Sequence, residues 1–383
     1  MLAITACAAL GVLLALELFA AAQFARRRAL ERSAPPDLGE APRVVLVVPC
    51  KGLERGLREG LESYATQSHP RYRLVLATAT ADDPAVPAIR EVARRHRHVE
   101  HLVAGEDERY GPKIYNVLRG IESAPGSDVY AFGDSDIGPD PGWLGRLVRP
   151  LGDARIGATT GYRWYWNGQP GLWDRVTSLW NGFVLFYMAL PPLRFVWGGS
   201  YALRREVLEE VDLRRTWRQV VNDDLTLTSA IRRNGYQIAF VPSCVSFSAG
   251  SFTFAGMIEW TTRQLIQTRF YFGRVFYGSL GVMVGSAALA VLAPWTFLAM
   301  ATIFGIGTVG MAHATLPARD PRKPRWVDAG LFALCEVPLA IAVVIAIFKS
   351  TLTWRGAVYR IHSATHMTVE RGGSAPALAD PIE

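Results

Sequence analysis

Long, nearly uncharged apolar runs near both ends of the chain limit its possible architectures. They cover Leu2–Phe24, Tyr277–Ala314 and Val327–Phe348, and the chain as a whole is 50% hydrophobic. A helix of about 20 apolar residues crosses the hydrocarbon core of a bilayer, which is roughly 30 Å thick. Apolar residues distributed this unevenly exceed what one soluble core needs. The sequence therefore predicts a multi-pass membrane protein with one soluble domain between the first and second runs.

The first run is interpreted as a retained membrane helix at residues 1–25 and not as a cleaved signal peptide. It is broken only by Glu17, and its basic cluster, Arg26–Arg28, follows the apolar residues without a small-residue cleavage site before it. A signal peptide has the opposite arrangement of charge. Basic residues that flank a span stay on the cytoplasmic side. We therefore expect a basic linker at 26–42 and a cytoplasmic domain at 43–275.

Residues 276–350 are expected to hold transmembrane or re-entrant segments. The second run is too long for one upright helix and contains Pro294, which favours two short spans that meet near Ala293. The third run carries Glu336 and Pro338 at its middle, so a re-entrant hairpin and a full span both stay open. A C-terminal tail follows at 351–383, and its Ala-, Pro- and Gly-rich end after about residue 372 is expected to be disordered.

The net charge of +7 does not indicate a nucleic-acid partner. Basic residues gather beside the apolar runs, as in 319–325, and in surface-helix patterns, as in 90–97, which an anionic membrane surface explains. With the Ala- and Arg-rich composition, this indicates a bacterial inner membrane, and a Golgi membrane stays open as the alternative. Neither paired nor metal-ligand spacing is found among the cysteines, which we interpret as reduced and structural: Cys7, Cys50, Cys244 and Cys335.

The region between the membrane segments has the pattern of an α/β domain. Short β-rich runs alternate with amphipathic segments, an order typical of a sheet with helices on its faces. The expected strands are Val44–Val48, Arg73–Thr78, Val99–Val103 and Asp128–Phe132. The expected helices are Leu57–Gln67, Val86–His96, Lys113–Glu122 and Gly142–Leu151. Ligands of such sheets bind beyond the carboxyl ends of the strands, and three of these strands are followed by polar clusters.

Asp134-Ser135-Asp136 follows an apolar strand and is the cluster that most suggests a metal site. Alternate residues share one face of a strand, so both carboxylates would reach the strand end on the same side. Mg²⁺ or Mn²⁺ takes oxygen ligands and neutralises a departing diphosphate. An Asp-rich turn that only begins a loop is the structural alternative.

Two further acidic clusters have a structural and a functional interpretation. Asp82-Asp83-Pro84 could start a helix, because Asp before Pro is a preferred start, or a carboxylate there could hydrogen-bond a nucleotide. Asn222-Asp223-Asp224 opens a helical segment, where negative charge is favourable in any protein. Its functional interpretation is a base that deprotonates an acceptor hydroxyl during inverting sugar transfer. Asp224 is the first candidate for that base, and Asp223 the second.

Trp197-Gly198-Gly199-Ser200 and the aromatic segment before it complete the set of candidates. The glycines permit close backbone approach to a ligand, although a tight turn would use them as well. The segment 164–197 is dense in Trp, Tyr, Phe and Leu. Core packing is the default interpretation of such residues, and an interfacial helix that admits a lipid is the alternative.

In these residues the chain resembles family 2 type glycosyltransferases, and more closely the ceramide glucosyltransferase branch with its bacterial relatives acting on hopanoids or other lipids. The resemblance covers about 42–274. It rests on an ordered set of motifs: Pro49-Cys50-Lys51-Gly52, Asp82-Asp83-Pro84-Ala85, Gly111-Pro112-Lys113-Ile114-Tyr115-Asn116, Asp134-Ser135-Asp136, Gly198-Gly199-Ser200 and Asp223-Asp224. It implies a Rossmann-like, nucleotide-sugar-binding glycosyltransferase A-type domain with flanking transmembrane helices.

The resemblance also implies roles for single residues. Asp83 would contact the nucleotide, Asp134 and Asp136 the metal and diphosphate, and Asp224 would supply the base. The donor would be a UDP-sugar and the acceptor a lipid such as ceramide. The other residues expected at the nucleotide-sugar are Pro49, Lys51, Lys113, Asn116, Gly199 and Arg263.

The chain departs from the family at its usual Gln/Arg-x-x-Arg-Trp element. It has Trp260-Thr261-Thr262-Arg263-Gln264 there, which keeps an arginine able to neutralise a diphosphate but loses the flanking pattern. This weakens the rival interpretation of a processive polysaccharide synthase. A non-enzymatic membrane scaffold is the remaining rival, and the three acidic clusters speak against it. Trp354-Arg355-Gly356 also looks like the tail of bacterial members, without an assigned role.

Overall fold

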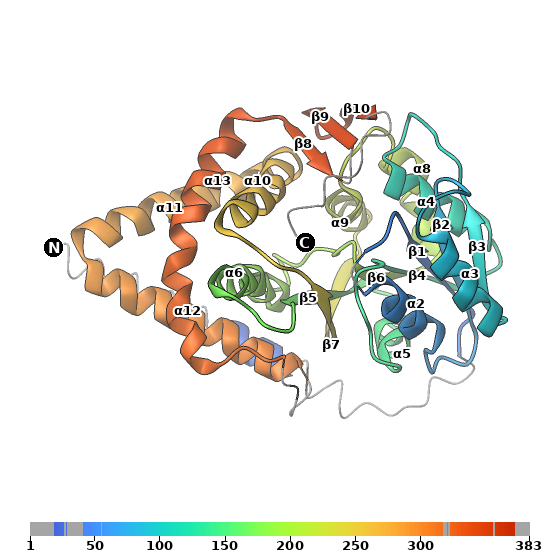
Figure 1. The fold of residues 1–383 in the computed structure, drawn as a ribbon, viewed down its shortest axis with the longest axis horizontal. Coiled ribbons are helices and arrows are strands. Elements are labelled where there is room, and N and C mark those ends of the chain that lie inside the picture. Colours follow the sequence, from blue (N-terminus) through green and yellow to red (C-terminus); the bar gives the residue numbers. More distant parts are fainter. Residues whose placement is uncertain are drawn as a thin grey trace.

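The computed structural model describes residues 19–26, 28, 41–54, 56–316, 320, 322–354 and 357–371. Its centre is a seven-stranded sheet in the order β3-β2-β1-β4-β6-β5-β7 (Figure 1). β1, β2, β3 and β4 are parallel, β6 is antiparallel to both of its neighbours, and β5 is parallel to β7. The strands are β1 Val44–Pro49, β2 Tyr72–Thr78, β3 Val99–Val103, β4 Val129–Gly133, β5 Ile156–Trp166, β6 Ser200–Arg204 and β7 Gln237–Ala249.

Helices follow the first strands in the order that the sequence predicts, and the α/β fold class is confirmed. Each expected strand and helix is present within a few residues of its predicted ends. The helices of this region are α2 Leu57–Ala65, α3 Val86–Arg95, α4 Pro112–Glu122, α5 Trp143–Val148, η1 Arg149–Gly152, α6 Leu172–Ala189, α7 Arg205–Glu210, α8 Leu213–Thr216, α9 Asp223–Arg233 and α10 Phe254–Tyr271.

Strand β1 shows why the sheet lies in the middle of the domain. All six of its residues are buried, and five of them are apolar and non-proline. Val44 and Leu46 pack with α2, α3 and α5 on one face, whereas Val45 and Val47 pack with α4 and α9 on the other. A strand covered on both faces reads as a continuous apolar run, because neither set of alternating side chains meets water. The strand ends are therefore the places where polar side chains can gather.

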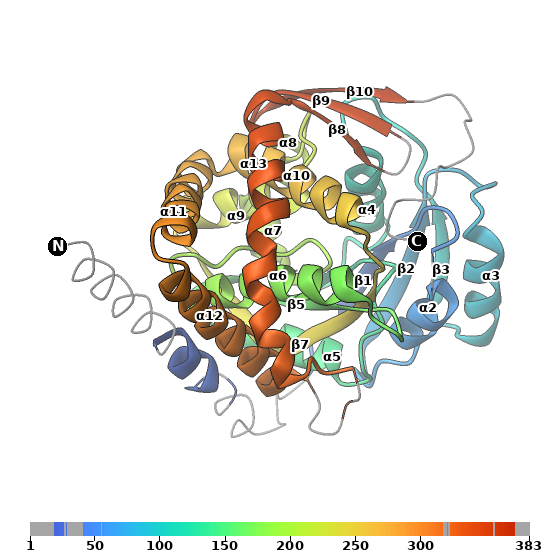
Figure 2. The same cartoon turned by 60° about the vertical axis from the view of Figure 1, so that its left-hand side comes forward.

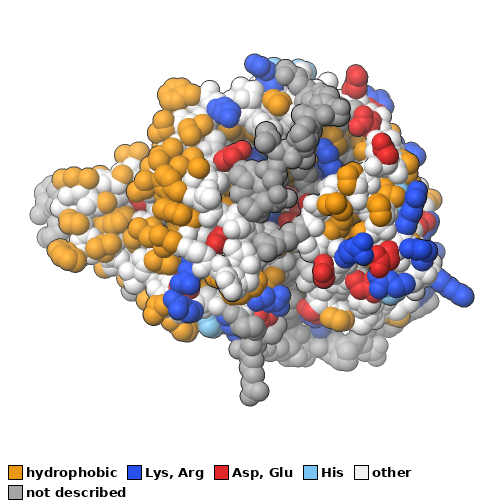
Figure 3. Space-filling model, in the orientation of Figure 1, with side chains coloured by type: hydrophobic (Ala, Val, Ile, Leu, Met, Phe, Trp, Pro, Cys, Tyr) orange, Lys and Arg blue, Asp and Glu red, His pale blue; other side chains and the backbone are white. Residues whose placement is uncertain are grey.

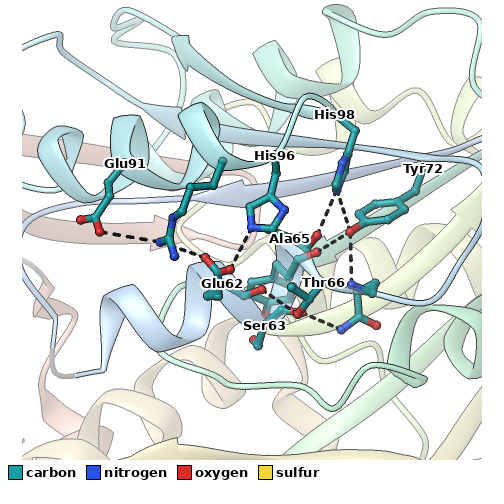
Figure 4. Close-up of polar contacts among 11 residues, drawn as sticks. Glu62, Ser63, Ala65, Thr66, Tyr72, Glu91, His96 and His98 are labelled. Carbon is teal, nitrogen blue, oxygen red and sulfur yellow. Dashed lines mark hydrogen bonds and ion pairs between the residues drawn. The ribbon is translucent and has the colours of Figure 1, made fainter.

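Polar contacts also hold the helices of the first face together (Figure 4). Glu62 on α2 accepts from His96 and pairs with Arg95 at the end of α3. His98 lies against Tyr72 of β2, with 2.8 Å between its Nε2 and the tyrosine hydroxyl oxygen. Burial lowers the pKa of His98 below its usual range. These contacts join α2, α3 and the start of β2, so they stabilise the packing of the domain.

Three apolar helices, together called the apolar arm, lie on one side of the domain: α11 and α12 project away from it, and α13 packs along α10 (Figure 1). α11 spans Gly273–Leu292 and α12 spans Pro294–Thr315, so the predicted break at Ala293 is confirmed. The third apolar run is one helical segment, with 3₁₀ geometry in η2 (Trp326–Cys335) and α geometry in α13 (Glu336–Phe348). Each of the three is long and apolar enough to cross a membrane. Apolar side chains cover the arm in the space-filling view (Figure 3).

Helix α6 joins this arm to the sheet. It packs on β5 and against α12 and η2, where Phe183 meets Phe304 and Phe332 with 5.6 Å between ring centroids in each pair. Trp180 and Phe186 stack on the two sides of Phe183. The aromatic segment predicted at 164–197 therefore lies between the soluble domain and the apolar helices.

A second sheet follows the membrane arm, where the sequence indicated only a tail. Its antiparallel strands are β8 Thr351–Trp354, β9 Ala357–Ser363 and β10 His366–Arg371. Leu352, Tyr359 and Ile361 pack with Val221 and with α10 and α13. Figure 2 shows the sheet running from the end of α13 across the top of the domain. It thus reaches back to the segment just before α9.

Several sequence predictions fall on residues that the structure does not describe. Residues 1–18 of the first apolar run, most of the linker at 26–42 and the end of the tail at 372–383 lie outside the described residues. Residues 19–26 are helical. The buried Phe24 packs against Phe240 of β7, with 6.0 Å between the ring centroids. Among the described cysteines, Cys50, Cys244 and Cys335 are buried and form no disulfide with one another, and Cys7 lies outside the described residues.

Candidate active site

The site lies where strands β1, β2 and β4 end and β6 begins. Asp134 directly follows β4, and its backbone N–H donates to the Gly199 carbonyl at 3.2 Å. The buried Tyr64 hydroxyl donates to the Asp134 carbonyl at 2.9 Å. These backbone contacts leave the Asp134 carboxylate at the strand end, on the edge where a ligand of an open α/β sheet binds.

Lys113 connects two acidic clusters that are far apart in sequence. Its Nζ lies 2.9 Å from Asp134 Oδ1, 3.6 Å from Asp223 Oδ2 and 3.3 Å from the Gly198 carbonyl oxygen. Lys113 stands in the first turn of α4, and only 19% of its side chain is exposed. Burial opposes its charge, but Asp134 and Asp223 outweigh that effect and raise its pKa. The site therefore contains a permanent cation among its carboxylates.

Asn222 caps α9, so capping does not account for the two aspartates after it. Its side-chain oxygen accepts from the Leu225 N–H at 2.6 Å, and its amide donates to Gln267 of α10 at 2.8 Å. Asp223 instead pairs with Lys113, and Asp224 Oδ2 accepts from the Gly198 N–H at 2.9 Å. Helix capping therefore explains Asn222 alone. The carboxylates of Asp223 and Asp224 face the site.

Asp223 is buried and Asp224 beside it is half-buried, and both the partial loss of water and the neighbouring carboxylate favour the neutral forms. Burial raises the pKa of Asp224 to about 7, with repulsion from Asp223 as the next cause. Burial also raises the pKa of Asp223, against the opposing effect of Lys113. Asp224 Oδ1 is buried without a hydrogen-bond partner among the described residues. A carboxylate with one held oxygen and one free oxygen is suited to accept a proton.

The two glycines before β6 are required by close packing. A Cβ on Gly199 would overlap the Trp197 ring and lie 2.8 Å from Asp134 Oδ2. A Cβ on Gly198 would lie 3.2 Å from both Asp224 Oδ2 and Lys113 Nζ. Such contacts are closer than side-chain atoms normally approach, so a larger residue would displace the carboxylates. The glycines thus allow the carboxylates and Lys113 to lie against this backbone, and close approach of a ligand there stays a prediction.

One carboxylate oxygen of Asp136 has no hydrogen-bond partner among the described residues. Its Oδ2 accepts from the Ser248 hydroxyl at 3.0 Å, whereas its Oδ1 is buried without a partner among the described residues. Ser135 between the two aspartates turns away and donates to Glu54. Oxygen ligands of this kind fit Mg²⁺ or Mn²⁺. No group of three or more His, Cys, Asp or Glu side chains gathers within the described part of the chain, so Asp134 and Asp136 would need ligands from the substrate.

The residues expected at the nucleotide lie along the neighbouring strand ends. Asp83 Oδ1 accepts from the Gly52 N–H at 2.8 Å and from the Ala85 N–H at 2.9 Å, so it orders the β1 loop and the start of α3 together. Asn116, one turn after Lys113, donates to the Ala77 carbonyl at 3.4 Å. Pro49 ends β1, and the exposed Lys51 follows it. No described contact joins Asp83 directly to the Lys113 cluster, although both lie on one sheet edge.

Arg263 lies on α10, one turn after Trp260. Trp260 packs against Tyr165 of β5 with 5.9 Å between ring centroids. The Tyr165 hydroxyl and Trp260 Nε1 are both buried without partners in the described residues. Burial raises the pKa of Tyr165, while Arg163 and Arg263 lower it. The altered family element therefore borders the site on its β5 side.

Sequence reasoning missed two residues of the site. Arg163 of β5 lies over the Tyr165 ring, with 4.5 Å between its Cζ and the ring centroid. The sequence signal for Arg163 was that it is the one charged residue in β5. The Trp354 ring of β8 lies 5.8 Å from Lys113 Nζ. The sequence resemblance includes the motif that begins at Trp354, but no pattern in the sequence connects Trp354 to Lys113.

Comparison with known proteins finds relatives that are named as sugar transferases. It is similar to a ceramide glucosyltransferase from Gibberella zeae, at 33% identity over 33% of this chain and 27% of the relative. It is also similar to a ceramide glucosyltransferase from Pyricularia oryzae, at 31% identity over 32% of this chain and 30% of the relative. The chain thus spans less than a third of the length of these curated relatives.

A solved structure shares the fold over most of the chain. It is the mannosyltransferase PcManGT from Pyrobaculum calidifontis in complex with GDP-Man and Mn²⁺, with a TM-score of 0.50 and 20% identity over 87% of this chain and 99% of that one. This likeness confirms the expected glycosyltransferase A-type fold. The apolar helices and the curated relatives indicate a membrane protein. Residues 5–367 match the family model of glycosyl transferase family 21, and the chain belongs to that family.

Proposed function

We propose that the chain is an inverting glycosyltransferase that moves one glucose-type sugar from a UDP-sugar to a lipid hydroxyl such as that of ceramide. The observation that carries the proposal is the largely buried cluster of Asp134, Lys113, Asp223 and Asp224 at the carboxyl ends of the strands, where Lys113 pairs with Asp134 and Asp223. The family, and relatives named as ceramide glucosyltransferases, support the substrate class.

Asp134 and Asp136 would hold Mg²⁺ or Mn²⁺ together with the donor diphosphate. The partnerless Asp136 Oδ1 and the carboxylate donor set fit a hard cation, and the mannosyltransferase of the same fold is named with Mn²⁺. When bound, the cation would supply positive charge that stabilises the leaving diphosphate. Lys113 already pairs with Asp134, so its ammonium is positioned to share that task.

The nucleoside would lie over β1 and β2. Asp83 is held between Gly52 and Ala85, so its carboxylate is fixed at the end of β2. Pro49, Lys51 and Asn116 belong to the same edge, and Gly199 gives the donor room beside Asp134. Arg263 lies on α10, where its charge acts on Tyr165 of β5. We assign these residues to donor binding.

Asp224 would be the base of the reaction. The acceptor oxygen would form a bond to the anomeric carbon as its proton passes to Asp224 and the bond to the nucleoside diphosphate breaks. A pKa near 7 leaves a large fraction of Asp224 unprotonated at neutral pH and still able to bind a proton. Asp223, which pairs with Lys113, is the second candidate for the base.

The acceptor would reach the site from the membrane. Apolar helices α11, α12 and α13 follow the catalytic residues, and α6 places an aromatic surface between them and β5. Trp and Tyr favour the headgroup level of a bilayer. We propose a catalytic domain at 43–275 on the cytoplasmic face and a membrane region at 276–350. The Arg-rich flanks favour a bacterial inner membrane.

A substrate screen tests this function. Purified protein would be incubated with Mg²⁺ or Mn²⁺, a total lipid extract and a panel of labelled UDP-sugars, and labelled products identified by mass. One sugar on a lipid is the expected product. A long sugar polymer would identify a processive synthase instead, and the absence of both transfer and donor hydrolysis would identify a scaffold.

A further inference from the structure

Arg163 occupies an unusual position at the border of the site. It stands on β5 opposite Ser246 of β7, within a strand whose neighbours are mostly buried. Its guanidinium lies between two aromatic rings, with its Cζ 4.5 Å from the Tyr165 centroid and 5.6 Å from the Trp197 centroid. Stacking on two rings holds the plane of the guanidinium in place. Its orientation is therefore set before any ligand arrives.

The charge of Arg163 lacks a counterion within the described protein. Its Nε is buried without a hydrogen-bond partner, and no carboxylate of the described residues lies within 4.0 Å of its nitrogens. Burial lowers its pKa, but Tyr165 and Asp136 act in the opposite direction and the net pKa is raised. A buried cation is costly unless it is paired. The protein keeps an unpaired guanidinium where a ligand can complete its hydrogen bonds.

Strand pairing connects Arg163 to the proposed metal carboxylates. Tyr165, which carries the guanidinium on its ring, is opposite Ser248, and the Ser248 hydroxyl donates to Asp136. On the other side, the Trp197 ring and Asp134 Oδ2 both approach Gly199. The guanidinium thus stands beside both members of the Asp134-Ser135-Asp136 element without bonding to either.

The order of the strands says which part of the donor would lie there. The nucleoside side of the site is formed by β1 and β2, and the sheet continues through β4 and β6 to β5. Arg163 therefore lies beyond Asp134 along this edge, on the side away from Asp83. A donor that starts over β2 and crosses β4 would bring its distal phosphate toward β5. Guanidinium binds phosphate oxygens through paired, planar N–H donors.

We propose that Arg163 binds the sugar-linked phosphate of the nucleotide donor and thereby selects a nucleoside diphosphate over a monophosphate. This rests on the proposed function, because it requires a nucleotide donor in the site. Arg163 is then a specificity-determining residue for the leaving group, separate from the carboxylates, from Lys113 and from Arg263.

The test compares UDP with UMP by titration calorimetry in the presence of Mn²⁺, using the full chain in detergent. The wild type should bind UDP more tightly than UMP. Arg163→Met, which keeps an apolar stem between the rings, should weaken UDP binding by roughly 10- to 100-fold, the range of a charge-assisted hydrogen bond. UMP binding should change by less than about twofold, because the missing phosphate is the proposed contact. Arg163→Lys should be intermediate, since it keeps the charge without the planar fork.

Arg155→Met is the matched control, because Arg155 is exposed and pairs with Asp153 just before β5. It should leave both affinities unchanged. Equal losses of UDP and UMP affinity in Arg163→Met and Arg163→Lys would show a merely structural role and overturn the proposal, as would unchanged UDP affinity. A wild type that binds neither nucleotide would overturn the proposed function itself, which is a distinguishable result.

Discussion

Asp224 and Asp223 are adjacent in sequence but differ in their surroundings. Asp223 lies beside Lys113, whereas Asp224 is held by the Gly198 N–H and keeps one oxygen free. The Lys113 ammonium thus lies between Asp223 and Asp134. In the proposed reaction, this difference would let one helix start supply both a partner for Lys113 and a base.

Replacing Asp224 by Asn keeps the shape of the side chain and removes its ability to accept a proton. We expect UDP affinity within about threefold of the wild type and a loss of turnover of roughly 10²- to 10⁴-fold, the usual contribution of general base catalysis. Calorimetry and single-turnover transfer would separate the two effects. Glu108→Gln, at an exposed residue before α4 and outside the candidate clusters, is the control. Near-normal turnover of Asp224→Asn would exclude it as the base.

The raised pKa of Asp224 predicts the pH dependence of transfer. A base acts only when unprotonated, and a raised pKa extends the protonated form to higher pH. Turnover should therefore be constant above about pH 7 and fall by about tenfold per pH unit below it. Single-turnover rates measured from pH 5.5 to 8.5 at saturating donor would show this. A profile that stays flat down to pH 5.5 would contradict a base with this pKa.

Gly199→Ala tests the close packing beside Asp134. The added Cβ would meet the Trp197 ring and Asp134 Oδ2, so one of them must move. We expect a loss of stability of about 1–3 kcal/mol from overpacking and a clear loss of donor binding. Gly145→Ala in α5 is the control, since nothing lies within 4 Å of its added Cβ. Thermal unfolding and UDP titration would report both, and an unchanged UDP affinity would contradict the assigned proximity.

At the scale of elements, the C-terminal sheet links the apolar arm to the site. It begins just after α13, packs on α10 and the segment before α9, and places Trp354 beside Lys113. Tyr359 of β9 also packs close to Gly111, which precedes α4: a Cβ added to Gly111 would lie 3.7 Å from the Tyr359 Cε1 atom. Two contacts from one small sheet therefore fix the start of the helix that carries Lys113.

Trp354→Ala should impair transfer without unfolding the domain. Removing the ring takes away a cation–π contact of about 0.5–2 kcal/mol and its packing, which predicts a roughly 3- to 30-fold loss of transfer. Trp354→Phe should recover part of the activity, because it keeps an aromatic face. Thr353→Ala, at the exposed neighbouring residue on β8, is the control. Equal transfer rates for Trp354→Ala and Thr353→Ala would contradict a positioning role.

The elements differ in how far sequence alone predicts them. The strands from β1 to β4 and their helices were predicted because burial on both faces makes continuous apolar runs, and turns of Asp, Gly and Pro separate them. The C-terminal sheet was missed although Ala357, Tyr359 and Ile361 alternate with exposed residues. Its partners, Val221 and Ile266, are remote in sequence, and so is the pairing of Lys113 with Asp223. Pairings of that kind depend on the whole fold.

At the scale of the whole molecule, the apolar arm is joined through α6 to β5, which borders the candidate site. The arm exposes large apolar side chains, including Val282, Val291 and Trp295, as helices long and apolar enough to cross a membrane would. α6 connects that arm to β5, where Tyr165 and Arg163 border the carboxylates. A soluble acceptor would not need this arrangement. The account therefore requires that transfer depend on a membrane-borne acceptor.

Transfer in lipid vesicles tests this requirement most directly. Vesicles with and without ceramide would receive the purified protein, Mn²⁺ and the UDP-sugar that the screen identifies, and products would be resolved by mass. The account predicts ceramide carrying one sugar, formed only with ceramide present and abolished by a metal chelator. A growing sugar polymer, or equal sugar release without any lipid product, would contradict it.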